Sequence, residues 1–241
     1  MDLYTEESYI KVLIAVPAYG GQVSTDWMMA FVNTQQMGIE KNIIFGIHVR
    51  SNSSLIPKCR DEIVHKFLFE TDYDYLLCID ADVVWIPEQI LGMVDKAKTY
   101  GTIFGPYPAK QDENKFFIEP MRIDGDLVEQ DGLIRLKSGP AGFMMVSRET
   151  LLNLRDQNKF LEYKSSEYEE RVCALFMPMI FMDQYRGEDI SFCIRLLHAN
   201  ERMWVDPSIE LTHIGIKKYK QSFTEFLNAN TDTQPKQVSA R

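Results

Sequence analysis

The sequence has few basic residues for its length. Its 241 residues include 26 Lys and Arg but 35 Asp and Glu, which gives a formal net charge of −9. Binding of nucleic acid without sequence preference requires a basic surface, so the composition argues against nucleic acid as a partner. It leaves open a small ligand that carries phosphate, because a bound cation can supply positive charge locally.

Cysteine pairs and long apolar runs are also missing. The four cysteines are Cys59, Cys78, Cys173 and Cys193. They form no C-x-x-C pair, and three of them lie inside apolar patterns. We therefore expect reduced core residues in a cytosolic protein. No apolar stretch approaches the length of a membrane span, and the acidic start MDLYTEESY is unlike a signal peptide. The sequence thus predicts a cytoplasmic protein without an integral membrane segment.

Strand and helix patterns alternate through the first part of the chain. They predict strands at 10–21, 42–49, 74–80 and 101–107, and helices at 24–38, 54–70 and 87–100. Gly38 is the expected end of the first helix, and Ser54 is the expected cap of the second. Such alternation predicts an α/β fold, with a mostly parallel sheet, helices on both faces and a ligand site beyond the carboxyl ends of the strands.

The pattern changes after residue 116. Two Asp-Gly turns, at 124–125 and 131–132, lie between short β-like runs and predict a small antiparallel insertion. The later patterns predict a strand at 139–147, a long active-site loop or lid at 160–187, a helix at 189–200 and two short strands within 203–215. We expect a single domain over residues 1–227, followed by a polar, disordered tail at 228–241.

Three positions carry side chains suited to catalysis or metal binding. Asp80 and Asp82 follow the apolar run LLCI, so a buried strand would deliver two carboxylates to its own end, where their oxygens suit Mg²⁺ or Mn²⁺. Glu188 and Asp189 begin a predicted helix in RGEDISF, and His213 stands alone among apolar residues in ELTHIG. Taken singly, each has a plainer explanation: a solvated strand end, a helix cap or a core histidine.

The order of these sites along the chain resembles the GT-A glycosyltransferases, in particular family-2-like members from large DNA viruses and bacteria. The similar stretches span residues 10–215: AVPAYGG, YDYLLCIDADVVWIPEQI, GPYPAK, SGPAGFMMVSRETL, YRGEDISFCIRL and DPSIELTHIG. The resemblance implies a metal-dependent enzyme that moves a sugar from a UDP-, dTDP- or GDP-sugar to a hydroxyl of a glycan or other acceptor. It also implies inversion of the anomeric carbon. The absence of a clear Q-x-x-R-W motif of processive synthases favours a single transfer.

The same resemblance implies a role for each of these acidic and histidine residues, either in metal binding, in nucleotide binding or in catalysis. Asp82 and His213 would ligate Mn²⁺ or Mg²⁺, and Asp80 would face the ribose or ligate the metal through water. Asp189, next to Glu188, would take the proton from the acceptor hydroxyl. The amino end of its helix favours the charged form, so we expect this carboxylate to stay ionised near neutral pH.

Further residues are implied on the nucleotide side of the site. The nucleotide would contact Pro17, Ala18, Tyr19, Arg60, Asp80 and Ala81, and Lys217 and Lys218 would reach the diphosphate. Ordinary solvated surface is the plainer explanation for the two lysines. Many family-2 enzymes place an aspartate after the second strand to hold uracil, whereas GIHVRSNSS has Arg50 and Ser51 there. The base of the donor therefore stays open.

Two other functions stay open. The stretch IDADVV also fits haloacid dehalogenase-like phosphatases, in which Asp80 would be the nucleophile and Asp82 an acid-base. That class usually begins with this strand, whereas two strand-helix units precede it here, and His213 would have no role in it. The third hypothesis is a catalytically silent domain that only binds a nucleotide sugar or a glycan.

Overall fold

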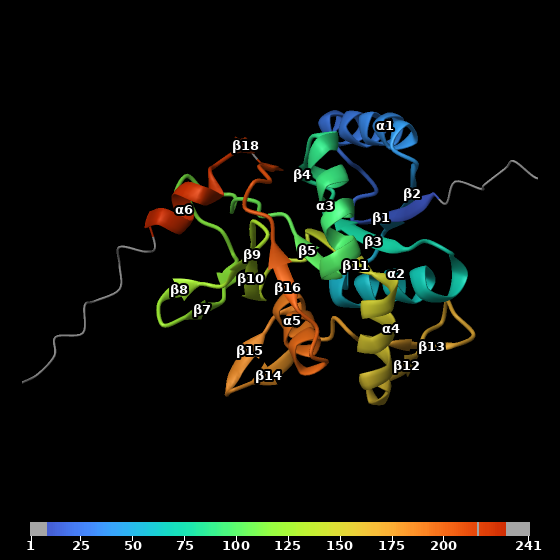
Figure 1. Cartoon of the computed structure of the whole chain (residues 1–241). Helices are drawn as coiled ribbons and strands as arrows, with labels where there is room; N and C mark the ends of the chain where they lie inside the picture. Colours follow the sequence, from blue (N-terminus) through green and yellow to red (C-terminus); the bar gives the residue numbers. More distant parts are fainter. Residues whose placement is uncertain (1–8, 216, 230–241) are drawn as a thin grey trace, which may run out of the picture.

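A computed structural model describes residues 9–215 and 217–229, and its largest sheet is mixed, with parallel and antiparallel strands (Figure 1). The order across the sheet is β2 (Ile43–Ser51), β1 (Ile10–Ala18), β3 (Tyr75–Ile79), β11 (Phe143–Ser147), β5 (Thr102–Phe104), β16 (Met203–Val205), β10 (Leu133–Ser138) and β6 (Glu119–Pro120). β1 is parallel to β2 and β3, and β16 is parallel to β5. β11 runs antiparallel between β3 and β5. The predicted mostly parallel α/β sheet is confirmed.

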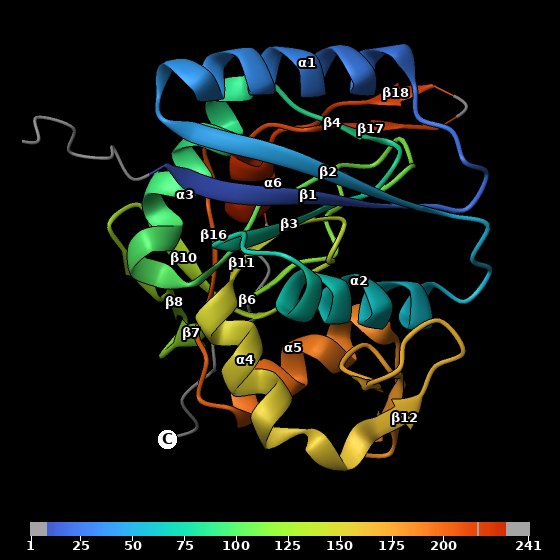
Figure 2. The ribbon, with the colours of Figure 1, turned by 90° about the vertical axis from the view of Figure 1, so that its right-hand side faces the viewer.

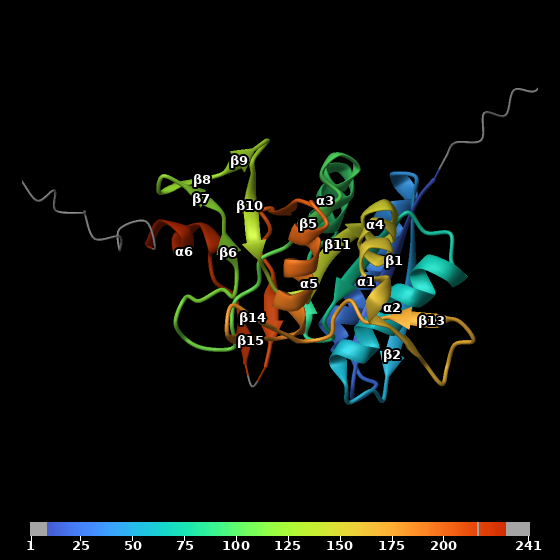
Figure 3. The same ribbon diagram turned by 90° about the horizontal axis from the view of Figure 1, so that it is seen from below.

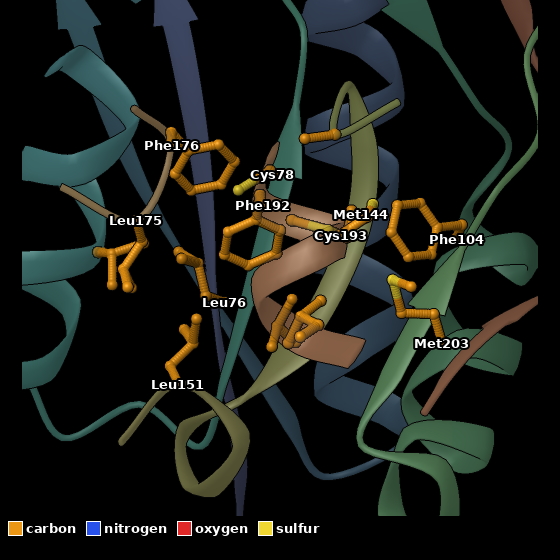
Figure 4. Close-up of a cluster of buried hydrophobic side chains, with 14 of the residues drawn as sticks. Leu76, Cys78, Phe104, Met144, Leu151, Leu175, Phe176, Phe192, Cys193 and Met203 are labelled. Carbon is orange, nitrogen blue, oxygen red and sulfur yellow. The ribbon is translucent and has the colours of Figure 1, made fainter. Parts of the chain in front are cut away.

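Helices cover both faces of the sheet (Figure 2). α1 (Thr25–Glu40) and α3 (Pro87–Tyr100) lie on one face, and α2 (Ile56–Glu70), α4 (Arg148–Gln157) and α5 (Glu188–His198) lie on the other. Strand β1 shows why, because successive side chains of a strand point to opposite faces. Leu13 and Ala15 join the apolar cluster beneath α2, α4 and α5, whereas Val12 and Ile14 join the cluster beneath α1 and α3. Figure 4 shows part of the first cluster, where the Phe176 and Phe192 rings lie against each other.

The first helix begins where predicted but ends later. Ser24 caps α1, since its side chain accepts a hydrogen bond from the backbone N–H of Trp27 at 3.0 Å. The predicted end at Gly38 is wrong, because α1 continues to Glu40. Gly38 is buried, and a Cβ there would lie 2.7 Å from the ring of Phe45. The glycine therefore permits close packing of helix on strand and does not stop the helix.

The predicted cap of the second helix is also wrong. The residue before α2 is Leu55, not Ser54, and no side chain caps this end. Pro57 occupies the first turn, where a missing N–H costs nothing because that group has no partner within the helix. The inward face is apolar, and Ile63 and Phe67 are almost fully buried.

The antiparallel insertion is confirmed. β7 (Arg122–Ile123) and β8 (Asp126–Leu127) form a hairpin around Asp124-Gly125, and β9 (Glu129–Gln130) pairs with β10 around Asp131-Gly132. Both aspartates have positive φ, as such tight turns require. Figure 3 shows these strands projecting from the sheet on the side away from α1 and α2. Helix α6 (Phe223–Ala229) packs on this part through Phe223 and Phe116.

The segment at 160–187 is not the structureless loop that we predicted. After a short 3₁₀ turn, it forms two hairpins: β12 (Glu162–Lys164) with β13 (Arg171–Cys173), and β14 (Met179–Phe181) with β15 (Gln184–Arg186). Strands of three residues are too short to show a periodicity of two, which is why the sequence did not reveal them. The Ser165 hydroxyl donates to the buried carboxylate of Glu62 at 2.9 Å, so the first hairpin is fastened to α2.

Three further predictions concern the termini and the cysteines. All four cysteines are buried and free, as expected. Asn228 and Ala229 belong to α6, so the disordered tail does not begin at residue 228, and residues 230–241 lie outside the described part of the chain. Over the residues that the structure describes, no helix has both the length and the apolar character that crossing a bilayer would need.

Candidate active site at the carboxyl edge of the sheet

The ends of β1 and β3 bring the first two predicted groups together. Ala15 pairs with Cys78 in parallel register, so Ala18 and Asp80 emerge at the same edge of the sheet. Ala18 is buried, whereas the Tyr19 side chain that follows is 65% exposed. An exposed aromatic ring at this edge suits stacking against a nucleotide base.

Asp80 is held by a buried arginine. Nη2 of Arg60 donates to Oδ1 of Asp80 at 2.9 Å, and the whole Arg60 residue is only 3% exposed. Burial opposes the charge on Arg60, but Asp80 and Asp189 outweigh it and raise the arginine pKa. A third contact runs from Nη1 of Arg60 to the carbonyl oxygen of Ala141 at 3.4 Å. Arg60 thus neutralises carboxylates from β3 and α5.

The approach of Asp80 depends on a glycine. Gly142 accepts a backbone hydrogen bond from Asp80 at 2.9 Å. A Cβ on Gly142 would lie 2.3 Å from both Oδ2 of Asp80 and the hydroxyl oxygen of Tyr107. Tyr107 is partly buried beside Asp80 and Asp189, and burial together with their charges raises its pKa, so the phenol stays neutral.

Replacing Gly142 by Ala is therefore expected to displace Asp80 and to destabilise the fold. Overpacking of this kind costs about 1–3 kcal/mol. Gly92→Ala in α3 is the matched control, because a Cβ there meets nothing within 4 Å and a helical alanine gains about 0.5–1 kcal/mol over glycine. Urea unfolding should shift to lower concentration for G142A and to higher concentration for G92A. Equal midpoints for the two variants would contradict the close approach.

His213 reaches Asp82 through a strand pairing of long range. β4 (Val83–Val84), which follows the D-x-D turn, pairs antiparallel with β17 (Thr212–Ile214), and the backbone N–H of Ile214 donates to the Asp82 carbonyl at 2.7 Å. Nε2 of His213 then lies 3.5 Å from Oδ1 of Asp82. Nδ1 of His213 is 2.8 Å from the carbonyl oxygen of Pro108. Since a carbonyl only accepts, the Nδ1 proton is fixed there and Nε2 faces Asp82.

Lys110 completes the surroundings of Asp82. Its ammonium group pairs with Oδ2 of Asp82. Partial burial opposes ionisation of Asp82, but His213 and Lys110 lower its pKa to about 2. Asp82 is thus a carboxylate at neutral pH and already attracts positive charge. Lys110 belongs to the stretch GPYPAK, but it lies in a loop without periodicity, and we did not predict it as a site residue.

Asp189 enters the site from the first turn of α5. Gly187 is the cap residue of this helix, so Asp189 is not its cap. Oδ1 of Asp189 is buried, has no hydrogen-bond partner within residues 9–215 and 217–229, and lies 3.9 Å from Nε of Arg60. Burial, with the charges of Glu188 and Asp80, raises the Asp189 pKa to about 6 in spite of Arg60. The predicted effect of the helix end is therefore outweighed by burial.

The remaining predicted residues lie at varying distance from this group. Ala81 lies in the D-x-D turn, Pro17 is the residue before Ala18 at the end of β1, and Glu188 precedes Asp189 on α5. The two lysines are engaged elsewhere: Lys217 pairs with Asp112, and Lys218 pairs with Asp26 at 2.5 Å. The structure thus brings together Asp80, Asp82, Asp189, Arg60 and His213, and it holds Lys217 and Lys218 in other ion pairs.

The donor set around Asp82 fits a divalent cation with two protein ligands. Two ligand atoms that each lie about 2.1 Å from one ion, at right angles to each other, are roughly 3 Å apart. Nε2 of His213 and Oδ1 of Asp82 are 3.5 Å apart, which is close to this separation. The proton fixed on Nδ1 leaves Nε2 suited to ligation. No group of three or more His, Cys, Asp or Glu within the described residues could hold a metal. Mg²⁺ commonly accepts such sparse protein ligation and takes its other oxygens from phosphate and water.

Comparisons with known proteins come from structure and not from sequence. No protein-family model and no curated protein matches the sequence. The structure of A197 from STIV gives a TM-score of 0.52 at 17% identity and covers 86% of each chain. A structure of GalNAc-T7 with UDP, GalNAc and Mn²⁺ gives a TM-score of 0.52 at 9% identity over 88% of this chain and 45% of that one. The chain thus corresponds to less than half of the GalNAc-T7 chain.

At these identities the similarity concerns the fold alone. GalNAc-T7 is a GT-A glycosyltransferase, and the present chain has a GT-A-like fold, as the sequence resemblance predicted. The site residues and their roles rest on the geometry described above.

Proposed function

We propose that the chain transfers a sugar from a nucleoside-diphosphate sugar to a hydroxyl acceptor. One observation carries the proposal: at the carboxyl edge of a GT-A-like sheet, Arg60 joins Asp80 to Asp189 while His213 faces Asp82. This edge is where ligands of such sheets bind. An acceptor base needs a carboxylate oxygen that can take a proton, which Asp189 offers. A diphosphate site needs ligands for a cation, which Asp82 and His213 offer.

Each residue has a defined task in this proposal. Asp82 and His213 would hold Mn²⁺ or Mg²⁺, which would act as a Lewis acid and offset the negative charge of the diphosphate leaving group. Tyr19, at the end of β1, lies against the base, and Asp80, fixed by Arg60, faces the ribose. Oδ1 of Asp189 accepts the proton of the acceptor hydroxyl as that oxygen attacks the anomeric carbon.

A single displacement of this kind inverts the anomeric carbon. Attack and departure occur on opposite sides of the sugar, so the base and the diphosphate site must lie on opposite sides of it, which residues from different elements can achieve. Asp189 comes from α5, whereas Asp82 and His213 come from the turn after β3 and from β17. Asp189 also has no hydrogen-bond partner at Oδ1 among the described residues, which leaves it free for the acceptor. On this basis we propose an inverting reaction.

The phosphatase alternative is less well supported. A nucleophilic Asp80 would need an oxygen free to attack phosphorus, yet Oδ1 is bound by Arg60 and Oδ2 lies against Gly142 and Tyr107. The third possibility, a binding domain without catalysis, gives no role to the Oδ1 atom of Asp189, which is buried and has no hydrogen-bond partner among the described residues.

A panel of nucleotide sugars tests the proposed function. UDP-, dTDP- and GDP-sugars are incubated with the protein and Mn²⁺, and release of the nucleoside diphosphate is recorded. We expect release from at least one donor, lost on addition of EDTA. Release of phosphate from an aryl phosphate, with no release of diphosphate from any donor, would favour the phosphatase.

Transfer is expected to fall as the pH drops below about 6. The base must be ionised, and burial raises the Asp189 pKa to about 6, so kcat/KM should decline about tenfold per pH unit below that value. Protonation of Asp189 would not cause this loss by unfolding the protein. A carboxyl that binds its proton more tightly when folded stabilises the folded state as pH falls. A pH profile that stays flat through pH 6 would remove Asp189 as the base.

A further inference from the structure

A cavity separate from the candidate active site lies beside the amino end of α2. Its volume is about 340 Å³, within the range of cavities that hold small ligands. Most of the residues that line it are apolar: Leu55, Pro57, Leu161, Ala174, Met177 and Pro178. Three polar residues also line it: Lys58, Asp61 and Tyr163. None of these residues belongs to the group around Asp80, Asp82 and Asp189.

Two polar groups of this cavity are buried. The hydroxyl oxygen of Tyr163 has no hydrogen-bond partner in the part of the chain that the structure describes. Asp61 is 3% exposed and accepts a hydrogen bond from the backbone N–H of Phe176 at 2.7 Å. Burial, and then the charge of Asp61, raise the pKa of Tyr163, so the two groups are neighbours and the phenol keeps its proton. A buried hydroxyl without a partner costs about 1–3 kcal/mol, which a hydrogen bond to a ligand would recover.

The cavity adjoins the proposed catalytic base through two neighbouring elements. Arg60, which joins Asp80 to Asp189, and Asp61, which lines the cavity, are consecutive on α2. The backbone N–H of Phe176 donates to Asp61. The Phe176 ring lies 5.8 Å from the Arg60 guanidinium carbon. The same ring stacks on Phe192 of α5, with 4.2 Å between the ring centres (Figure 4). The chain then continues through Met177 and Pro178 of the cavity wall into β14.

Exposed apolar side chains continue from the cavity wall onto the β14–β15 hairpin. Met177 is 43% exposed at the cavity, and Ile180 and Tyr185 are 68% and 74% exposed on the β14–β15 hairpin. This hairpin runs directly into Gly187 and α5. It is also anchored to the site, because the backbone N–H of Met179 donates to the Ser191 hydroxyl at 3.1 Å in the first turn of α5.

We propose that this cavity binds the apolar part of the sugar acceptor. The acceptor is then amphipathic: a hydroxyl near Asp189, joined to an alkyl chain or ring in the cavity whose far end carries a hydroxyl for Tyr163 and Asp61. The inference names the acceptor class for the proposed transferase and so rests on that function. The apolar walls would contact the alkyl chain or ring, and the buried Tyr163 hydroxyl would supply one directional hydrogen bond.

The test uses three glucosides that share a head group: methyl, hexyl and 6-hydroxyhexyl β-D-glucopyranoside. The protein is labelled with ¹³C in the methionine methyl groups, and the Met177 signal is assigned from M177L. We expect both hexyl compounds, but not the methyl compound, to shift Met177 in a saturable way. Met28, exposed on α1 across the sheet, is the internal control and should not move. Shifts that are equal for all three compounds, or absent from Met177, would overturn the proposal.

Tyr163→Phe then tests the directional contact. Wild-type protein should bind the 6-hydroxyhexyl compound about threefold to tenfold more tightly than the hexyl compound, as one hydrogen bond provides. The variant should lose this preference and be at least as stable as the wild type, because the hydroxyl that it lacks is buried without a partner among the described residues. An unchanged preference in the variant would contradict the role of Tyr163.

A titration of UDP, dTDP and GDP with Mn²⁺ in the same samples separates this proposal from the proposed function. Binding of a nucleotide without any shift of Met177 overturns the cavity proposal alone. A shift of Met177 without binding of any nucleotide overturns the transferase, and with it the assignment of the cavity to an acceptor. Binding of both, with the hexyl compounds consuming donor faster than the methyl compound, is the result that we expect.

Discussion

Asp189→Asn is expected to lower the rate of transfer by a factor of about 10² or more while the protein stays folded. Asn has the shape of Asp but cannot accept the proton of the acceptor hydroxyl. The change should not weaken the helix, because Gly187 and not Asp189 is the cap residue of α5. Binding of donor and metal should persist, since Asp82 and His213 are untouched.

The measurement is single-turnover transfer, together with nucleotide binding and thermal unfolding of the same samples. Glu188→Gln is the matched control. Glu188 directly precedes Asp189, but in the part of the chain that the structure describes it forms no ion pair with Arg60. We expect a far smaller loss for E188Q. Normal transfer by D189N, or a product in which NMR shows retained anomeric configuration, would show that another residue or another mechanism operates.

Arg60→Met is expected to destabilise the protein by about 3 kcal/mol, the lower end of the cost of breaking a buried ion pair, because it leaves two partly exposed carboxylates without their countercharge. The Arg60 side chain is almost fully buried between Asp80 and Asp189. Methionine fills a similar volume and adapts to irregular space, so lost packing contributes little. The variant should also bind nucleotide poorly, since Asp80 loses the contact that orients it.

Lys66→Met is the control on the same helix. Lys66 forms an exposed ion pair with Glu70 at 2.7 Å, and pairs of that type contribute about 0.3–0.5 kcal/mol. Chemical unfolding of both variants at pH 7 compares them directly. If R60M were as stable as K66M, the buried charge network would not hold the site together.

The positions of the acidic residues could be predicted from sequence because they depend on local order. An apolar run followed by Asp80 and Asp82 predicts a buried strand with carboxylates at its end, and alternation of strands and helices fixes which end faces the ligand. The two Asp-Gly turns were equally readable, since only certain residues tolerate the backbone of such turns.

The arrangement around those acids could not be predicted from local patterns. His213 meets Asp82 because β17 pairs with β4 across more than a hundred residues of chain, and two-residue and three-residue strands leave no periodic signal. Arg60 appears in sequence as one charged residue of an amphipathic helix, yet it is buried because two carboxylates neutralise it. Gly142 was readable only as part of a glycine-rich approach to a strand.

The Asp189 pKa shows the same limit in electrostatic terms. Sequence places this carboxylate in the first turn of a helix, where the helix dipole favours its charged form. The structure buries it near Asp80 and next to Glu188, and these effects raise its pKa to about 6. Burial depends on the tertiary packing of α5 against α2 and the sheet, which a helix-end argument does not include.

Calorimetric titration of nucleoside diphosphates, with and without Mn²⁺, tests the central claim most directly. UDP, dTDP and GDP are each titrated into wild-type protein and into Asp82→Asn. The account predicts that at least one nucleotide binds about tenfold or more tightly with Mn²⁺, because Asp82 and His213 hold the cation against the diphosphate. The D82N variant should stay folded and lose that gain. Equal affinity with and without Mn²⁺ for all three nucleotides would contradict a metal-dependent nucleotide site at Asp82.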